Sequence, residues 1–326
     1  MPVASIIVPA FNVAKTIAET LDALLAQTFQ DFEIIVVDDG STDRTVDVLE
    51  NYSDDPRVRI VSQRNRGLAG ARNTGIHEAV GTYIGFCDAD DVWEPAKLQV
   101  HVNHLGRNPD IGISYSGSSL VDDEGTDLCI AQRPRLHGIT AAHILKRNPI
   151  GNGSAAVIRR EVFDEIAYRP RSERERCWFF DETFRQSEDI ECWLRIALTT
   201  GWEFEGVSGL LTRYRVNSSG LSASTDRQLE SWERVVAKLA AIQPAFFARH
   251  LKAARAYQLR YLARRAISDG QGERAVELSK ASLSGSLRPL FEEPSKTLTT
   301  LGATMVLRYA GPAALGAMMP KKGPKS

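Results

Sequence analysis

Residues 32–43 read Phe-Glu-Ile-Ile-Val-Val-Asp-Asp-Gly-Ser-Thr-Asp, an apolar β-branched run that ends in acidic and turn-forming residues. Three similar runs predict further strands, near residues 3–9, 57–62 and 82–87. An amphipathic helical pattern links the first two strands, and its buried face would hold Ile17, Leu21, Leu24 and Leu25. Because strands and helices alternate, the sequence predicts an α/β fold around a mostly parallel sheet.

The pattern changes twice along the chain. After about residue 110 the apolar runs become shorter, which favours a mixed sheet with loops. From about Asp226 onward, strand signals are absent and Ala, Leu, Arg and Glu recur at helical spacing. We therefore expect an α/β domain over residues 1–221 and a helical C-terminal region over 222–326. In the helical region, residues 245–283 resemble a tetratricopeptide-type hairpin, although two helices are too few for such a repeat array.

Composition excludes several classes of protein. The formal net charge of −1 over 326 residues argues against a general nucleic-acid binder. The four cysteines are far apart, so neither a zinc site nor a disulfide framework is predicted, and a reducing cytoplasm fits best. The N-terminus has no signal-peptide pattern, and no stretch is apolar enough to predict a membrane span.

Polar residues follow three of the predicted strands, in the segments 9–12, 38–43 and 88–91. In an open parallel sheet, ligands bind beyond the carboxyl ends of the strands. The first segment is Pro9-Ala10-Phe11-Asn12 and lacks the Gly-x-Gly-x-x-Gly pattern, which argues against a nicotinamide or flavin enzyme.

The third segment carries three carboxylates, those of Asp88, Asp90 and Asp91. Such carboxylates repel each other unless a cation or donor groups compensate their charge. A Mg²⁺ or Mn²⁺ ion takes carboxylate oxygens and keeps positions open for phosphate, so the segment suits a bound pyrophosphate. For Asp91 the alternative is a capping box with Glu94 at the start of the next helix.

Four segments, residues 5–12, 37–43, 65–75 and 88–91, occur in an order that resembles the family 2 inverting glycosyltransferases. The resemblance covers about residues 3–217. It implies a GT-A type nucleotide-binding mixed sheet flanked by helices, followed here by the helical C-terminal region. It also implies a divalent metal cofactor, Mn²⁺ or Mg²⁺.

The resemblance assigns residues to a nucleotide-sugar site. Ala10 and Phe11 would line the base pocket, and Asp39 would accept a hydrogen bond from the base, typically uracil. An Asx-type turn before a helix is the alternative role for Asp39. Asp90 would be the direct metal ligand, and Asp88 would lie by the ribose or the metal-bound waters. Three neighbouring residues are counted with the same site: Pro9, Asn12 and Ala89.

Each of three arginines near these segments has two alternative roles. Arg66 and Arg72 lie at a glycine-rich helix start, where they would either approach the phosphates or be surface residues of a tightly packed helix. The segment from Tyr214 resembles the family's Tyr-Arg-x-His stretch, which closes over the pyrophosphate, but Asn217 replaces the His. Arg215 is therefore either a phosphate contact or the partner in a structural ion pair.

Glu188 and Asp189, followed by Trp193-Leu194-Arg195, resemble the Glu-Asp motif that furnishes the catalytic base of the family. On local sequence alone the two acids are equally ordinary helix-start charge, with Ser187 as the capping residue. The resemblance implies that Asp189 takes the proton of the acceptor hydroxyl and that Glu188 supports it. Inverting transfer then needs no enzyme nucleophile.

We therefore expect a metal-dependent inverting glycosyltransferase that uses a nucleoside-diphosphate sugar, UDP-linked by resemblance, in bacterial cell-surface glycan or polysaccharide synthesis. The rival functions are a nucleotidyltransferase and a degenerate nucleotide-sugar-binding scaffold subunit. A haloacid-dehalogenase-type phosphatase is excluded, because Val37 stands where its nucleophilic Asp is needed.

The C-terminal region contains an apolar stretch with Leu298, Leu301, Met305, Val306 and Leu307, followed by Lys321, Lys322 and Lys325. Arg308 and Pro312 interrupt the stretch and argue against a membrane span. Two alternatives remain. An interfacial helix would touch the inner face of the cell membrane, where a lipid-linked acceptor is presented. Otherwise the stretch packs on the catalytic domain or on a second subunit of a homo-oligomer.

Overall fold

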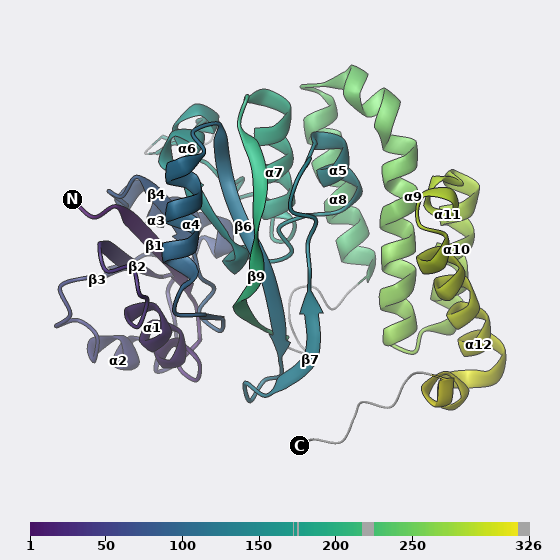
Figure 1. The fold of residues 1–326 in the computed structure, drawn as a ribbon, viewed down its shortest axis with the longest axis horizontal. Helices are drawn as coiled ribbons and strands as arrows, with labels where there is room; N and C mark the ends of the chain where they lie inside the picture. Colours follow the sequence, from purple (N-terminus) through teal and green to yellow (C-terminus); the bar gives the residue numbers. More distant parts are fainter. Residues whose placement is uncertain (172, 175, 217–224, 319–326) are drawn as a thin grey trace. The chain divides into compact units, whose positions relative to one another are not determined.

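The structure is a computed structural model that describes residues 1–171, 173–174, 176–216 and 225–318 (Figure 1). The chain divides into two compact units. Unit 1 comprises residues 1–144 and 148–220, and unit 2 comprises residues 145–147 and 221–326. The domain boundary expected at residue 221 lies outside the described residues, as do Asn217 and the three C-terminal lysines.

Among the described residues of unit 1, nine strands form one mixed sheet. Eight of them follow a continuous path: β3 (Val58–Ser62), β2 (Phe32–Asp38), β1 (Ala4–Ala10), β4 (Tyr83–Phe86), β8 (Ala156–Arg159), β6 (Ile111–Val121), β9 (Glu203–Arg215) and β5 (Val92–Trp93). The ninth, β7 (Asp127–Gln132), pairs with β6. Strands β1 to β4 pair in parallel, whereas β8 runs antiparallel between β4 and β6. The expected fold class, a sheet that begins parallel and becomes mixed, is confirmed.

Helices cover the two faces of the sheet. The buried face with Ile6 and Val8 packs on three helices, α1 (Ile17–Leu25), α2 (Thr45–Glu50) and α4 (Lys97–Arg107). On the other face, Ile7 lies against α3 (Gly67–Glu78). A Cβ atom at Gly75 would overlap the Ile7 side chain, so this glycine permits the close approach of helix and strand. The remaining helices of this region are α5 (Ala141–Lys146), α6 (Arg160–Ile166) and α7 (Glu188–Thr199).

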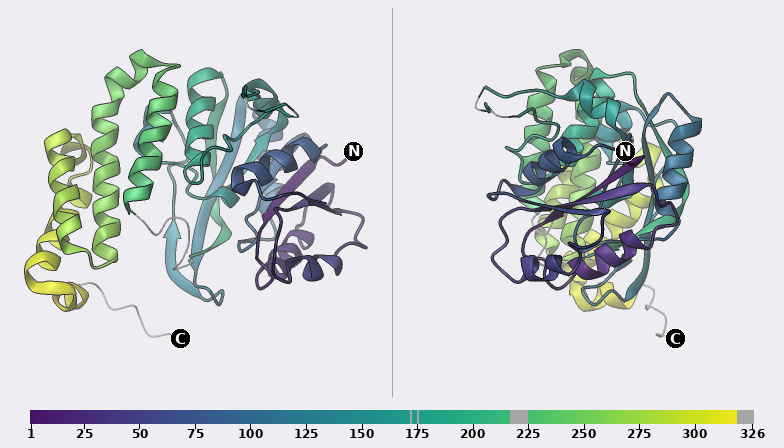
Figure 2. Two further views of the ribbon diagram at one scale, coloured as in Figure 1. Left: turned by 180° about the vertical axis from the view of Figure 1, so that it is seen from behind. Right: turned by 90° about the vertical axis from the view of Figure 1, so that its left-hand side faces the viewer.

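In the described residues of unit 2 the regular structure is helical. Its helices are α8 (Thr225–Ala240), α9 (Pro244–Ser268), α10 (Gly272–Gly285), α11 (Arg288–Glu292) and α12 (Pro294–Met318). Figure 2 shows α9 and α10 as a pair that lies side by side, and their core includes Leu262, Ala266 and Leu278. Leu307 of α12 packs on the same core. The backbone of α12 breaks at Gly311, where φ is 80°.

Candidate active site

Two of the strand-end segments meet at one edge of the sheet. In the parallel pair β1 and β2, Pro9 lies opposite Val37 and Ala10 opposite Asp38. The Asp39 N–H donates to the Ala10 carbonyl at 2.8 Å. Strand β4, which precedes the third segment, pairs with β1 on its other side. The sheet therefore gathers the three segments singled out from the sequence.

The first segment exposes an aromatic ring. Phe11 is 48% exposed, whereas Ala10 before it is buried. The Asn12 side-chain oxygen accepts backbone N–H groups of Thr42 at 2.8 Å and Asp43 at 3.2 Å, which ties the first segment to the second. The half-exposed Phe11 ring therefore lies at the carboxyl edge of the sheet, and stacking of this ring on a base stays a prediction.

Asp39 holds the start of α3. Its carboxylate is buried and accepts the backbone N–H groups of Arg66 and Gly67, both at 2.8 Å. The Gln63 side chain donates to the same carboxylate at 2.5 Å. The neighbouring Asp38 makes the local bond of this segment, since its Oδ1 accepts the Ser41 N–H at 3.1 Å, whereas the Asp39 carboxylate bonds to the distant residues Gln63, Arg66 and Gly67.

Asp91 points into the protein and caps no helix. Its carboxylate is fully buried and accepts the Ser154 hydroxyl at 2.5 Å and the Arg215 N–H at 2.9 Å. Burial, with the charges of Asp88 and Asp90, raises its pKa well above the usual value. The capping-box alternative was wrong, because α4 begins at Lys97, after the short strand β5.

Lys97 lies buried behind this turn, and the sequence analysis missed it. Its Nζ donates to the Ser154 carbonyl and to the Thr212 hydroxyl, both at 2.6 Å, and lies 4.6 Å from the centre of the Trp93 ring. Burial lowers the pKa of Lys97 to about 7. A lysine in the first turn of a helix normally faces water, so no sequence signal marks this one.

Asp88 and Asp90 fit the pair expected to hold a metal ion. Both side chains are partly exposed, so a ligand at the sheet edge can reach them. Within the described residues, no group of three or more His, Cys, Asp or Glu side chains is arranged to hold a metal alone. A Mg²⁺ ion in proteins commonly takes one or two carboxylates plus substrate phosphates, so two carboxylates suit a metal that arrives with a diphosphate.

Arg72 bridges the turn of Asp88 and the start of α7. Its Nη2 lies 3.0 Å from Asp88 Oδ1, and its Nη1 lies 2.8 Å from Glu188 Oε1. The guanidinium carbon lies 5.8 Å from the ring centroid of Phe86 and 5.6 Å from that of Phe180, and these two rings contact each other edge to face. Its side chain is 3% exposed. The reading of Arg72 as a surface residue was therefore wrong.

Arg66 is engaged more locally. It forms ion pairs with Glu182 at 2.8 Å and Glu173 at 2.5 Å, and its side chain is 31% exposed. Its contact with a phosphate stays a prediction.

The two acids of α7 differ in surroundings. Glu188 is buried, and burial, partly offset by Arg72, raises its pKa to about 7. Asp189 is more exposed, and its Oδ2 accepts the Asn148 side-chain N–H at 3.0 Å. Burial raises the pKa of Asp189 too. Ser187 occupies the N-cap position of α7, as expected, with φ of 62°, but its side chain makes no capping hydrogen bond.

Arg215 acts as a clamp in this structure. Its guanidinium pairs with Glu19 at 2.6 Å and donates to the carbonyl of Asp90 at 2.9 Å. It also donates to the carbonyls of Asp122 and Asp123, at 3.1 and 2.8 Å. The ion-pair alternative for Arg215 is therefore present, and the phosphate contact stays a prediction.

The loop 148–154 joins the two halves of the site and was also missed. Asn148 contacts Asp189, while the Ser154 hydroxyl accepts the Asp88 N–H at 2.8 Å. A Cβ atom at Gly153 would overlap Arg72 and crowd Asp88. Only a residue without a side chain fits beside this ion pair.

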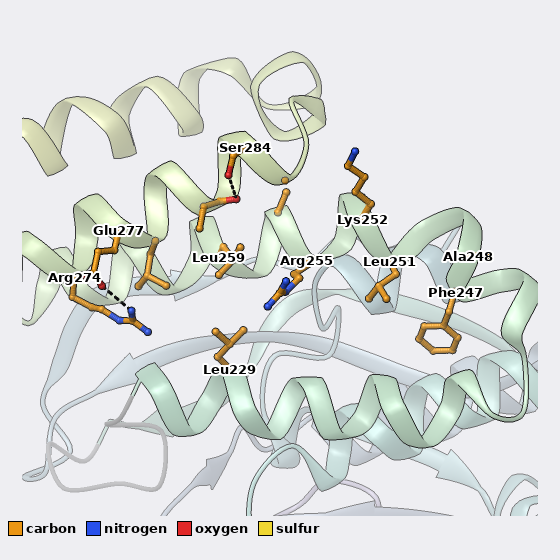
Figure 3. Close-up of a pocket in the computed structure, with 14 residues that line it drawn as sticks. Leu229, Phe247, Ala248, Leu251, Lys252, Arg255, Leu259, Arg274, Glu277 and Ser284 are labelled. Carbon is orange, nitrogen blue, oxygen red and sulfur yellow. Dashed lines mark hydrogen bonds and ion pairs between the residues drawn. The ribbon is translucent and has the colours of Figure 1, made fainter.

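A separate groove of about 780 Å³ lies in unit 2, between α8, α9 and α10 (Figure 3). Its wall is mostly apolar, with Leu229, Leu251 and Leu259, and none of the predicted site residues lines it. The candidate active site is therefore the carboxyl edge of the sheet in unit 1.

Comparison with known proteins identifies the family. The model of glycosyl transferase family 2 matches residues 5–167, half of the chain. The chain belongs to the family 2 glycosyltransferases. The family expected from the four segments 5–12, 37–43, 65–75 and 88–91 is confirmed.

Relatives of this family 2 member include three bacterial proteins. It is 51% identical over 100 residues to the glycosyltransferase EpsJ of Bacillus subtilis, covering 30% of this chain and 29% of EpsJ. It is 37% identical over 126 residues to chondroitin synthase of Escherichia coli, covering 38% of this chain and 18% of that protein. TuaG of Bacillus subtilis, named for teichuronic acid biosynthesis, is 30% identical over 226 residues, which is 68% of this chain and 82% of TuaG.

Solved structures share the fold. The mannosyltransferase PcManGT of Pyrobaculum calidifontis, in complex with GDP-Man and Mn²⁺, aligns with a TM-score of 0.57 at 21% identity, covering 97% of this chain and 85% of that one. TarS of S. aureus in complex with UDP-GlcNAc aligns with a TM-score of 0.54 at 19% identity, covering 97% and 84%. The GT-A type architecture expected for this family 2 member is confirmed.

Proposed function

We propose that this family 2 glycosyltransferase is a metal-dependent inverting enzyme that transfers a sugar from a nucleoside diphosphate to an acceptor hydroxyl. The observation that carries the proposal is the position of Arg72, which joins Asp88 on the nucleotide side to Glu188 beside Asp189. The residues proposed for the donor site and for the base would thereby belong to one ion-paired cluster, which supports a reaction in which donor and base act on the same acceptor.

Asp189 would act as the general base. Its carboxylate takes the proton of the acceptor hydroxyl while the hydroxyl oxygen bonds to the anomeric carbon, and the bond from that carbon to the diphosphate oxygen breaks on the opposite face. Burial raises the pKa of Asp189, which strengthens it as a proton acceptor, and the positive charge of Arg72 partly offsets this rise.

The donor would bind along the sheet edge. Phe11 would stack on the base, with Pro9, Ala10, Asn12 and Ala89 shaping the site. Asp39 would accept a hydrogen bond from the base. Asp90, with Asp88, would hold a Mn²⁺ or Mg²⁺ ion, which supplies neutralisation of the charge on the departing diphosphate when bound.

The relatives support a nucleotide-sugar donor but differ in its identity. One structural neighbour is titled with UDP-GlcNAc and another with GDP-Man and Mn²⁺. We propose a UDP-sugar on the resemblance of the strand-end segments. The acceptor would be a glycan or a lipid-linked saccharide of bacterial surface polysaccharide synthesis, in line with the name of TuaG. The enzyme would work in the cytoplasm, at the inner face of the membrane.

A screen of UDP- and GDP-sugars tests the proposal. One donor should be hydrolysed slowly and should raise the melting temperature, with both effects larger in Mn²⁺ than in chelator. NMR of the product should show the inverted anomer, and a retained anomer would reject the mechanism. Pyrophosphate release from a nucleoside triphosphate and a sugar phosphate would instead indicate a nucleotidyltransferase. Stabilisation without turnover would indicate a binding scaffold.

A further inference from the structure

Helix α12 turns its polar side inward. Thr297, Thr300 and Thr304 are at most 4% exposed. The Thr297 hydroxyl accepts a hydrogen bond from Arg260 at 2.7 Å, and the Thr304 hydroxyl lies 3.3 Å from that of Ser279. The helix is thus attached to α9 and α10 through hydrogen-bonded threonines as well as through Leu307, which packs on their apolar core.

The opposite side of α12 is apolar and exposed. Leu298, Met305 and Tyr309, here called the apolar stripe, are 59%, 53% and 79% exposed. Their spacings of seven and four residues place them on one face of the helix. Of the thirteen large apolar side chains exposed in the described residues, five fall within residues 287–309. This concentration marks a surface that is unfavourable in water and suited to contact.

The charge of the segment complements an anionic surface. Residues 294–326 contain five basic residues and no acidic residue. Lys296 pairs with Glu293 and Arg308 pairs with Glu273. The basic excess of the segment therefore comes from the other three residues, Lys321, Lys322 and Lys325. The burial of apolar side chains in a membrane and the attraction of basic residues to anionic lipid are each weak contributions to binding. Together they hold a helix at the membrane interface. Tyr309 suits the boundary between headgroups and hydrocarbon.

We propose that the apolar stripe of α12 lies on an anionic lipid bilayer, with the helix in the plane of the interface. Among the described residues, no helix is long and apolar enough to cross a membrane, and α12 breaks at Gly311. The use of this surface rests on the proposed function, because a lipid-linked acceptor would be presented there, but its detection needs no transfer activity.

Vesicle co-sedimentation of the full chain tests the proposal. The vesicles are phosphatidylcholine alone and phosphatidylcholine mixed with phosphatidylglycerol. The variant is Leu298→Gln with Met305→Gln, and the matched control is Ile130→Gln, which alters a side chain of similar exposure, 49%, on β7 of unit 1. Melting temperature and transfer to a soluble acceptor should be unchanged in both variants.

The wild type and the Ile130→Gln control should pellet with anionic vesicles, less so at high salt, and the double variant should bind roughly tenfold more weakly. Equal binding of the double variant, or no binding of the wild type, would overturn the proposal. Light scattering without lipid tests the alternative occupant, a second copy of the chain. If the wild type is a dimer and the double variant is a monomer, the stripe would be assigned to the contact between copies. Loss of vesicle binding with intact transfer would leave the proposed function standing.

Discussion

Arg72 Nη1 lies 2.8 Å from Oε1 of Glu188, although the two residues are 116 positions apart in the chain. The other terminal nitrogen of the same guanidinium lies on Asp88. The proposed nucleotide side and the proposed base side of the site therefore share one ion-paired cluster, in which Arg72 and Glu188 are buried. A substitution on the Asp88 side of this cluster should therefore affect the Glu188 side, and the reverse.

Replacing Arg72 by Met leaves Glu188 buried without its cation. We expect the free energy of unfolding to fall by about 3–5 kcal/mol, the usual cost of breaking a buried ion pair on one side. Arg72→Lys should lower the free energy of unfolding by less, because lysine keeps the positive charge although it lacks the planar guanidinium. Urea unfolding measures the change. Arg44→Met is the control, since Arg44 is 87% exposed and its pair with Asp47 should contribute at most about 1 kcal/mol. Equal losses in the two Met variants would contradict a buried cluster.

Glu188 should make stability depend on pH. Its pKa of about 7 in the folded protein exceeds the ordinary value of 4.5, so the folded state binds more protons between these pH values. The contribution of Glu188 to the free energy of unfolding therefore falls as pH rises from about 4.5 to 7. Glu188→Gln should remove this pH-dependent decrease. The free energy of unfolding of the variant, relative to that of the wild type, should therefore rise across that window. Urea unfolding at both ends of the window tests it, and parallel pH profiles of variant and wild type would exclude the shift.

Asp189→Asn should separate donor binding from transfer. The substitution keeps size but removes proton affinity, so transfer should fall by roughly 10²- to 10⁴-fold while donor affinity persists. Initial rates and calorimetric titration with the donor measure the two effects. Asp47→Asn, on the exposed side of α2, is the matched control. Full transfer in Asp189→Asn would reject the base.

Asp90→Ala should weaken the metal-assisted binding of the nucleoside diphosphate without lowering the melting temperature, because it relieves repulsion within the Asp88–Asp91 turn. Titration with UDP in Mn²⁺ and in chelator measures the metal-dependent part of the affinity. That part should disappear in the variant. Undiminished turnover of the variant in chelator would refute the metal assignment.

Asn148 should act as a positioning residue for Asp189. Its N–H favours the ionised carboxylate, so Asn148→Ala should raise the pKa of the base and move the acid limb of the kcat/KM profile to higher pH. Asn148→Asp adds a like charge and should move it further. A purely structural role would lower activity equally at all pH values, with no displacement of the limb.

The sequence predicted which acidic residues lie at the carboxyl edge of the sheet, and the roles of these residues stay predictions. Asp39, Asp88 and Asp90 come directly after apolar runs, and parallel strands bring such ends together whatever else the chain does. The partners of Arg72 and Lys97 could not be predicted in this way. Arg72 meets Glu188 only after α7 packs beneath the sheet, and Lys97 is buried because Thr212, from a strand far along the chain, closes over it. The spacing of residues in the sequence gives no information about such contacts.

The clamp formed by Arg215 bears on how the protein is made. Strand β9 is the last element of the sheet to leave the ribosome, and it carries the guanidinium that ties Glu19 to the carbonyl of Asp90. Nascent chains that end before β9 contain every acidic residue of the proposed site. They lack the Arg215 side chain, which fixes the turn at Asp90. Synthesis of residues 216–326 then takes roughly 5–20 s at about 5–20 residues per second. The sheet thus has seconds to close around its own last strand before the helices of unit 2 are complete.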